Sequence, residues 1–176
     1  MSDAIVPVFY HMPYATFLDD VQALARQVGE GAWRPDFIIG IGRGGLVPAV
    51  YVSHQLAVPM LSVDHSSRVP GFAEELLDRL AANSAQGTRL LFVDDINDSG
   101  GTITTIRDIL AKSGCLQENL RFAVLVSNTR STAQVDYSAQ VIDRSQDKRW
   151  FVFPWEAVAT AEAIAQEAQS VPERLA

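Results

Sequence analysis

Two adjacent carboxylates, Asp94 and Asp95, follow an apolar run in the stretch RLLFVDDINDSGGT, residues 89–102. The apolar residues 90–93 predict a buried β-strand that ends at the acidic pair. Ionised carboxylates at the end of a strand can accept hydrogen bonds from sugar hydroxyls or hold a hard divalent cation through oxygen. Asp94 and Asp95 are therefore candidates for binding a ribose and a metal ion.

A turn of small polar residues and glycines separates the acidic pair from a helix expected over residues 102–113. Gly100 and Gly101 can adopt backbone angles closed to other residues, so that successive N–H groups converge on an anion. The helix that begins at Thr102 directs its unpaired N–H groups and its positive dipole end at the same point. A plain strand-to-helix connection can contain such a turn, but the acidic pair at fixed spacing favours a ribose 5-phosphate site.

A second glycine-rich loop, GRGG at residues 42–45, follows a strand expected over residues 37–41 and precedes a helix expected over residues 45–56. It holds the guanidinium of Arg43 and several backbone N–H groups at the carboxyl edge of a parallel sheet, where open α/β folds bind ligands. A diphosphate fits such a loop. The alternative is a surface arginine in an ordinary turn.

These motifs resemble those of the type I phosphoribosyltransferases, which bind 5-phosphoribosyl 1-diphosphate (PRPP) with Mg2+. The resemblance covers about residues 35–160, and VDDINDSGGT is its most specific part. It implies that Asp94 and Asp95 bind the ribose hydroxyls and the metal, that Arg43 assists the pyrophosphate leaving group, and that Asp98 takes a proton from N7 of a purine. The implied phosphate contacts come from Asn97, Asp98, Ser99, Gly100, Gly101 and Thr102, and the implied pyrophosphate contacts from Gly42, Arg43, Gly44 and Gly45.

The aromatic segment WFVFPWE, residues 150–156, resembles the purine-binding hood of the bacterial xanthine-guanine and hypoxanthine phosphoribosyltransferases. By this resemblance Trp150 stacks on the base, Phe151 supplies main-chain contacts, and Glu156 lies where a backbone carbonyl meets the purine. Stacking on a base is worth about 1 to 3 kcal/mol. The alternative is that the aromatic side chains close the core under a C-terminal helix, which we expect of Phe153 rather than of Trp150.

Two segments depart from the family pattern. Family members place a lysine after the fourth strand to donate to the 6-oxo group, and Asn128 occupies that position here. An amide can still donate, but without the charge that roughly doubles the strength of such a bond. Arg130, Lys148 and Arg149 are nearby cations that can substitute. The flap that closes over PRPP in the family commonly carries a Ser-Tyr pair, whereas residues 66–68 are Ser-Ser-Arg.

An alternation of strand and helix patterns predicts the fold. Besides the segments already named, we expect a helix from about 13 to 29, strands at 60–63, 121–126 and about 139–142, and a helix over 72–82. Repeated βα units imply a parallel sheet with right-handed crossovers. The expected class is α/β: by resemblance, the three-layer type I phosphoribosyltransferase fold, a central, mostly parallel sheet flanked by helices, with a small hood. We expect a single domain over residues 1–176, with the core at about 35–143, the hood at about 144–156 and a C-terminal helix at 156–168.

Composition limits the partners of the chain. Its 176 residues, 48% of them hydrophobic, suffice for one domain with a sizeable core. A formal charge of -7 argues against nucleic acid or an anionic membrane as the main partner. Residues 1–10 lack the pattern of a signal peptide, no apolar run is long enough for a membrane span, and the single Cys115 cannot form an internal disulfide. We therefore expect a cytoplasmic protein.

The first functional hypothesis is a purine phosphoribosyltransferase that uses Mg2+ and converts PRPP and a free base, a 6-oxopurine by resemblance, into a nucleoside 5'-monophosphate and pyrophosphate. The family resemblance also implies a homo-oligomer, either a dimer or a tetramer. A PRPP- or nucleotide-sensing regulator of the same fold is the second hypothesis, but such a protein is expected to lose the acids or the hood, and this chain keeps both. A phosphoribosyltransferase for a non-purine base is the third, favoured by Asn128 and disfavoured by WFVFPWE.

Overall fold

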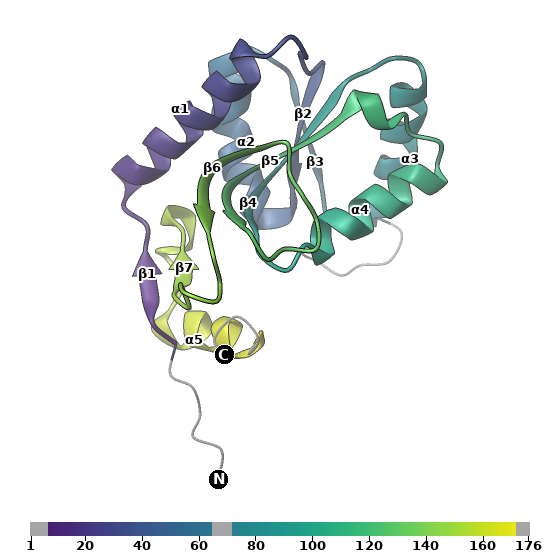
Figure 1. Cartoon of the computed structure of the whole chain (residues 1–176). Coiled ribbons are helices and arrows are strands. Elements are labelled where there is room, and N and C mark those ends of the chain that lie inside the picture. Colours follow the sequence, from purple (N-terminus) through teal and green to yellow (C-terminus); the bar gives the residue numbers. More distant parts are fainter. Residues whose placement is uncertain (1–6, 65–71, 172–176) are drawn as a thin grey trace.

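A five-stranded sheet forms the centre of the protein, whose computed structural model describes residues 7–64 and 72–171 (Figure 1). The strand order is β3-β2-β4-β5-β6, and every neighbouring pair is parallel. The strands are β2 (Phe37–Ile41), β3 (Met60–Val63), β4 (Leu90–Asn97), β5 (Leu120–Asn128) and β6 (Tyr137–Ile142). The predicted α/β class with a central parallel sheet is confirmed.

Four helices cover the two faces of this sheet and complete three layers. They are α1 (Tyr14–Glu30), α2 (Gly42–Leu56), α3 (Phe72–Ala85) and α4 (Gly101–Lys112). The α1 and α2 helices pack on one face, and α3 and α4 on the other (Figure 1). Successive side chains of a strand point to opposite faces, so Leu91 and Val93 of β4 contact the first pair of helices, while Leu90 and Phe92 contact the second. Burial on both faces explains why the strands read as continuous apolar runs.

A second sheet of two parallel strands lies beside the main sheet and was not predicted as a sheet. Its strands are β1 (Phe9–His11) and β7 (Trp150–Val152). Two short 3-10 helices, η1 (Gln117–Asn119) and η2 (Pro154–Glu156), and the helix α5 (Ala161–Gln169) complete the described elements. The hood segment is therefore anchored by a strand from the other end of the chain. Such a three-residue pairing leaves little sequence signal, since strand patterns need about four or more residues.

The C-terminal helix begins later than the predicted residue 156. Residues 154–156 form η2, in which the Glu156 carboxylate accepts a hydrogen bond from the Phe153 N–H at 2.7 Å. The α5 helix starts only after Thr160, whose Oγ1 accepts from the Ala163 N–H at 3.2 Å as an N-cap. The predicted start of this helix is wrong, and its predicted end is one residue short.

Two segments that were predicted to be loops are regular structure. The β4 strand does not end at the acidic pair; it pairs with β5 as far as Asn97, which lies opposite Ser127. The α2 helix begins at Gly42, so GRGG forms its first turn. Glycine and acidic residues are disfavoured in these elements, and here close contacts between the two segments override that preference.

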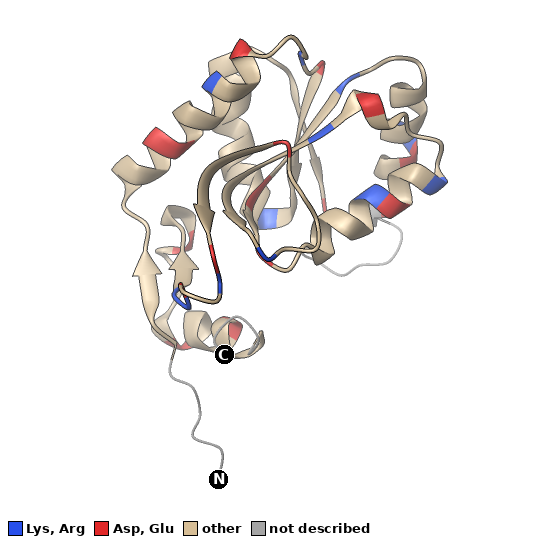
Figure 2. Ribbon diagram, viewed as in Figure 1, with Lys and Arg blue, Asp and Glu red and all other residues tan. Residues whose placement is uncertain are grey.

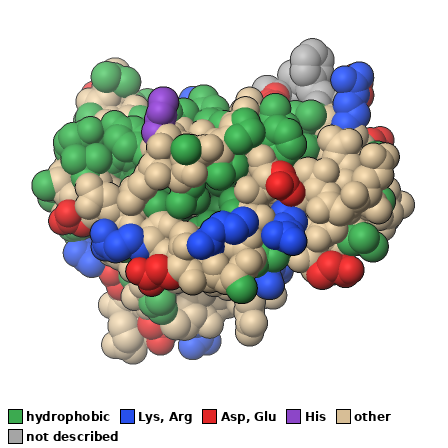
Figure 3. Space-filling model, turned by 90° about the horizontal axis from the view of Figure 1, so that it is seen from above, with side chains coloured by type: hydrophobic (Ala, Val, Ile, Leu, Met, Phe, Trp, Pro, Cys, Tyr) green, Lys and Arg blue, Asp and Glu red, His purple; other side chains and the backbone are tan. Residues whose placement is uncertain are grey.

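The surface carries both charge signs. Acidic and basic residues are interspersed along the helices (Figure 2). On the face seen in Figure 3, acidic and basic side chains alternate beside a region of hydrophobic side chains. In the described ranges, no helix combines the length and apolar character that crossing a membrane requires. The division into a single domain over residues 1–176 stays a prediction.

Candidate active site

A cavity of about 810 Å³ lies between the carboxyl ends of the central strands, the hood and α5. This volume is typical of small-molecule sites, which span roughly 300 to 1,000 Å³. The cavity unites three segments that are far apart in the sequence. The predicted residues that line it are Gly42, Arg43, Gly44, Asp94, Asp95, Thr102, Trp150, Phe151 and Glu156.

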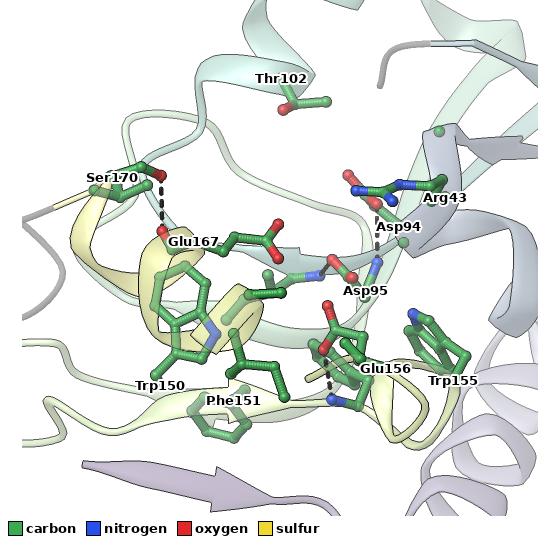
Figure 4. A pocket seen from close by; sticks show the side chains of 18 of the residues that line it. Arg43, Asp94, Asp95, Thr102, Trp150, Phe151, Trp155, Glu156, Glu167 and Ser170 are labelled. Carbon is green, nitrogen blue, oxygen red and sulfur yellow. Dashed lines mark hydrogen bonds between the residues drawn. The ribbon is translucent and has the colours of Figure 1, made fainter. Parts of the chain in front are cut away.

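The residues of α2 and β4 lie on one side of the cavity and those of β7 on another, with Glu156 and Glu167 near the latter (Figure 4). Arg43 and Asp94 lie at the end formed by the central sheet and α2, and Trp150 and Phe151 lie at the end formed by β7. The Glu167 side chain of α5 points into the space between them. A ligand with a charged part and a flat apolar part matches this division.

The Asp95 carboxylate packs directly against the first turn of α2. A Cβ atom added to Gly44 would lie 2.3 Å from Asp95 Oδ2, so only glycine leaves room for this carboxylate. The Asp95 Oδ1 also accepts the Ile96 N–H at 2.6 Å, and Asp94 Oδ1 accepts the Asp95 N–H at 3.0 Å. Both acids are thus held in place by the backbone while they line the cavity.

Two helix N-termini supply positive ends near the acidic pair. In the described part of the chain, the N-cap residues of α2 and α4 make no side-chain capping hydrogen bond, although Ser99 Oγ accepts the Gly101 N–H of α4 at 3.4 Å. First-turn N–H groups at a helix N-terminus are suited to binding an anion. Arg43 adds a guanidinium at the start of α2, and Thr102 brings a hydroxyl at the start of α4 to the cavity wall. Arg43 and the positive ends of the two helices attract phosphate groups, while Asp94 and Asp95 bring negative charge to the same cavity.

Several residues predicted to bind phosphate do not line the cavity. These residues are Gly45, Asn97, Asp98, Ser99, Gly100 and Gly101. Asn97 instead donates to the Ala133 carbonyl at 2.7 Å and accepts from the Ser131 hydroxyl at 2.8 Å. Gly100 has a φ of +92°, and a Cβ there would lie 2.6 Å from the Ala133 nitrogen. Asn97 and Gly100 thus pack against the segment that follows β5.

Asp98 is buried and forms an ion pair with Arg144. The Arg144 Nη2 lies 2.8 Å from Asp98 Oδ2, and Nε donates to both carboxylate oxygens at 3.0 and 3.1 Å. The two side chains are 9% and 3% exposed, respectively. Arg144 lines the cavity whereas Asp98 does not, so the guanidinium stands between the carboxylate and the cavity.

Asn128, which by resemblance occupies the family's lysine position, belongs to the same buried network. Its Nδ2 donates to the Asp98 carbonyl at 3.0 Å, and its Oδ1 accepts the N–H groups of Arg130 and Arg144 at 3.1 and 3.2 Å. Asn128 does not line the cavity. The Asn128 amide therefore supports the backbone around Asp98 and Arg144 and does not face the cavity.

Trp150 is only 9% exposed and packs against α5, where it clusters with Val152 and Ala168. Because side chains alternate along β7, Phe151 points the other way and joins the core beneath α1 and α2. Phe153 also belongs to that core, as expected, and stacks on Trp155 with ring centroids 4.9 Å apart. Trp150 thus contributes to the packing of the hood as well as to the wall of the cavity.

Glu156, like Glu167, brings a carboxylate to the side of the cavity near Trp150 and Phe151. Burial raises the pKa of Glu156, and the carboxylate of Glu167 raises it further. The hydrogen bond from the Phe153 N–H and the charge of Arg43 oppose this rise. A raised pKa favours the protonated acid, which can donate as well as accept a hydrogen bond.

Sequence reasoning missed Arg144 and the contribution of α5. Besides Glu167, α5 lines the cavity with Ala163 and Ile164. The alanine-rich pattern predicted a helix but not the surface it covers. Arg144 stands at the start of the predicted hood, and a basic residue at that point was the available signal. The flap prediction at Ser66, Ser67 and Arg68 lies outside the described residues.

The sequence matches the family model described as the phosphoribosyl transferase domain over residues 14–160. The chain therefore belongs to the phosphoribosyltransferase family, and the predicted resemblance is confirmed. The protein is accordingly a transferase of the pentosyl-transferring class.

Individual relatives support this assignment. The chain is 31% identical over 161 residues to a xanthine-guanine phosphoribosyltransferase of Roseobacter denitrificans, covering 84% of this chain and 85% of the relative. A purine phosphoribosyltransferase from Pyrococcus horikoshii has a similar structure, with 26% identity, a TM-score of 0.63 and coverage of 84% and 93% of the two chains. A xanthine-guanine-hypoxanthine phosphoribosyltransferase of Helicobacter pylori, 21% identical, shares the fold with a TM-score of 0.62 and coverage of 84% and 93%.

Proposed function

We propose that the protein transfers the ribose 5-phosphate group of PRPP to a 6-oxopurine base, forming a nucleoside 5'-monophosphate and pyrophosphate. One observation carries this proposal: a single cavity joins the acidic pair and Arg43 to the aromatic hood. A base and a sugar phosphate must lie side by side for the transfer, and the cavity has a wall suited to each. The relatives named for xanthine, guanine and hypoxanthine support a 6-oxopurine.

Transfer requires groups that stabilise the departing pyrophosphate. Departure of this group leaves positive charge on the sugar and negative charge on the pyrophosphate. We assign the leaving group to Arg43 and the first turn of α2, and the ribose hydroxyls to Asp94 and Asp95. We assign the 5-phosphate to Thr102 and the N-terminus of α4. Fixing the sugar between these groups aligns its anomeric carbon with the base.

Asp94 and Asp95 are suited to hold a Mg2+ ion that is also bound by the phosphates of PRPP. The described residues contain no group of three or more acidic, histidine or cysteine side chains that could hold a metal ion alone. Mg2+ is usually held by one or two carboxylates together with substrate phosphates, and Asp94 and Asp95 match this donor set. When bound, the metal would neutralise charge on the diphosphate.

The base occupies the hood side of the cavity in this proposal. The ring of Trp150 and the backbone of Phe151 are its predicted contacts, and Glu156 supplies a carboxylate nearby. Direct proton transfer from N7 to Asp98 stays a prediction, and it requires the ion pair with Arg144 to open. The cytoplasmic location and the oligomeric state also stay predictions.

Pyrophosphate release by the purified protein tests the proposal. The protein is mixed with PRPP, Mg2+ and one base at a time: hypoxanthine, guanine, xanthine, adenine or uracil. We expect release with the 6-oxopurines and much less with adenine or uracil. Release with uracil alone would indicate a transferase for a non-purine base. Tight PRPP binding without release for any base would indicate a sensor, as the regulatory alternative requires.

A further inference from the structure

Among the described residues, two arginines line the cavity, Arg43 at the start of α2 and Arg144 near Phe151 of β7. Arg144 lies in the segment between β6 and β7 and places its guanidinium carbon 5.5 Å from the Phe151 ring centroid. The other arginine of the same segment is placed differently. Arg149 pairs with Asp147 at 2.7 Å and covers the Tyr10 ring, and it does not line the cavity.

The guanidinium of Arg144 is fixed on three sides. Its Nε and Nη2 bind the Asp98 carboxylate, and its Nη1 donates to the carbonyls of Asp147 and Arg149 at 3.3 and 2.6 Å. A guanidinium has five N–H bonds. Within the described residues, Nη2 donates only to Asp98, which leaves one N–H of Nη2 for a ligand.

Asn128 cannot supply the donor that the family takes from a lysine at this position. Its amide nitrogen is held by the carbonyl and carboxylate of Asp98 at 3.0 and 3.4 Å, and its oxygen accepts two backbone N–H groups. The amide serves instead to support the ion pair. Arg144, in the connection between β6 and β7, is a charged group that lines the cavity on this side.

We propose that Arg144 selects the base by donating a charge-assisted hydrogen bond from Nη2 to the oxo group at C6 of the purine. This inference rests on the proposed function and names the residue that sets its specificity. Asp98 acts through Arg144, as a positioning residue that fixes the guanidinium plane. Adenine presents an amino group at C6, so two donors would face each other and binding would be disfavoured. Charge-assisted bonds are about twice as strong as neutral ones.

Binding of two nucleotides that differ only at C6 tests the proposal without requiring turnover. IMP carries the oxo group and AMP the amino group, while their ribose phosphates are identical. The variant is the double substitution Asp98→Asn with Arg144→Gln, because removing Arg144 alone would leave a buried carboxylate unpaired and destabilise the fold. The matched control is Asp147→Asn with Arg149→Gln, which neutralises the other ion pair of the same segment.

We expect the wild-type protein to bind IMP more tightly than AMP. The neutralised Asp98–Arg144 pair should lose about 10- to 100-fold in this ratio, chiefly through weaker IMP binding, and the control should keep the wild-type ratio. A purely structural role would weaken IMP and AMP equally, and an unchanged ratio would overturn the proposal. Failure of the wild type to bind either nucleotide or PRPP would instead refute the proposed function.

A crystal structure of the wild-type protein with IMP provides a readout that does not depend on the folding of any variant. The proposal places Nη2 of Arg144 within hydrogen-bond distance of the purine O6. Another side chain or a water molecule in that position would overturn it.

Discussion

Asp95 and Gly44 show how single residues build the site. The Asp95 carboxylate fills the space beside Gly44, because a Cβ atom at residue 44 would lie only 2.3 Å from Asp95 Oδ2. The sequence predicted both residues as ligand-binding, because acids after a strand and glycines beside an arginine are chemically distinctive. It could not predict their mutual contact, since that depends on how α2 packs on β4.

Asp95→Asn should weaken PRPP binding without unfolding the protein. An asparagine keeps an oxygen that can accept the Ile96 N–H, but it removes a charge that the ribose hydroxyls and Mg2+ would use. We expect the dissociation constant for PRPP in the presence of Mg2+, measured by calorimetry, to rise by roughly tenfold or more. Asp108→Asn, the same change on the exposed side of α4, is the control. Equal PRPP affinity in both variants would remove the assignment of Asp95.

The ion pair between Asp98 and Arg144 could not be predicted from the sequence. The sequence identified Asp98 by resemblance, but its burial and its partner depend on how residues 143–149 pack against it. No local pattern encodes such a contact across 46 positions. Asn128 was predicted to follow a strand that ends at residue 126, whereas it is the last residue of β5, and its part in supporting the pair became visible only in three dimensions.

At the scale of elements, periodicity predicted the strands and helices and many of their ends, but not the end of β4 or the starts of α2 and α5. Strands that are buried on both faces and amphipathic helices leave strong patterns, so β2, β3, β5 and α4 lie within two residues of their predicted bounds. The GRGG turn and the acidic pair were predicted as loops, because glycine and aspartate disfavour regular structure. Tertiary packing between α2 and β4 overrides that preference at both places.

Alanine substitutions in GRGG should separate binding from folding. At Gly45 a Cβ would lie 2.1 Å from the Val93 carbonyl oxygen, which the β4 backbone cannot move away, so Gly45→Ala should lower the melting temperature clearly. At Gly44 the neighbour is the Asp95 side chain, which can rotate, so Gly44→Ala should remain folded and lose PRPP affinity.

Gly29→Ala serves as the control for these variants, since its Cβ would meet only the end of Leu56 at 3.5 Å. Thermal melting and PRPP calorimetry on the three proteins make the comparison. Normal PRPP binding by Gly44→Ala would contradict the close packing of Asp95 on α2.

At the scale of the whole molecule, the site forms where the sheet, the hood and α5 meet. The three-layer core followed from the alternation of βα units, but the β1–β7 pairing and the α5 packing join distant parts of the chain and were not predictable from local patterns. A further long-range contact ties α1 to the edge strand β6: Asp20 accepts a hydrogen bond from Gln140 at 2.6 Å.

The buried Asp20 makes stability depend on pH. Burial raises its pKa above the ordinary 3.8, although the Gln140 hydrogen bond opposes the rise. The folded state therefore holds this proton more tightly than the unfolded state, and the ionised group costs stability above both pKa values. The cost disappears as pH falls below the unfolded value.

Asp20→Asn should accordingly raise the melting temperature at pH 7, and the gain should shrink toward zero at about pH 3. Asparagine keeps an oxygen to accept the Gln140 bond while carrying no charge. Melting curves from pH 3 to 8 for the wild type, Asp20→Asn and the exposed Asp108→Asn measure this. A gain that is independent of pH would show that the Asp20 charge is not its cause.

Identification of the product tests the central claim most directly. The wild-type protein is incubated with PRPP, Mg2+ and isotopically labelled hypoxanthine, and the reaction is followed by mass spectrometry. The account predicts labelled IMP that accumulates in equal amount to released pyrophosphate, and none with the double variant Asp94→Asn and Asp95→Asn. Unchanged hypoxanthine and intact PRPP after incubation, with a folded protein and the other 6-oxopurines equally inert, would contradict it.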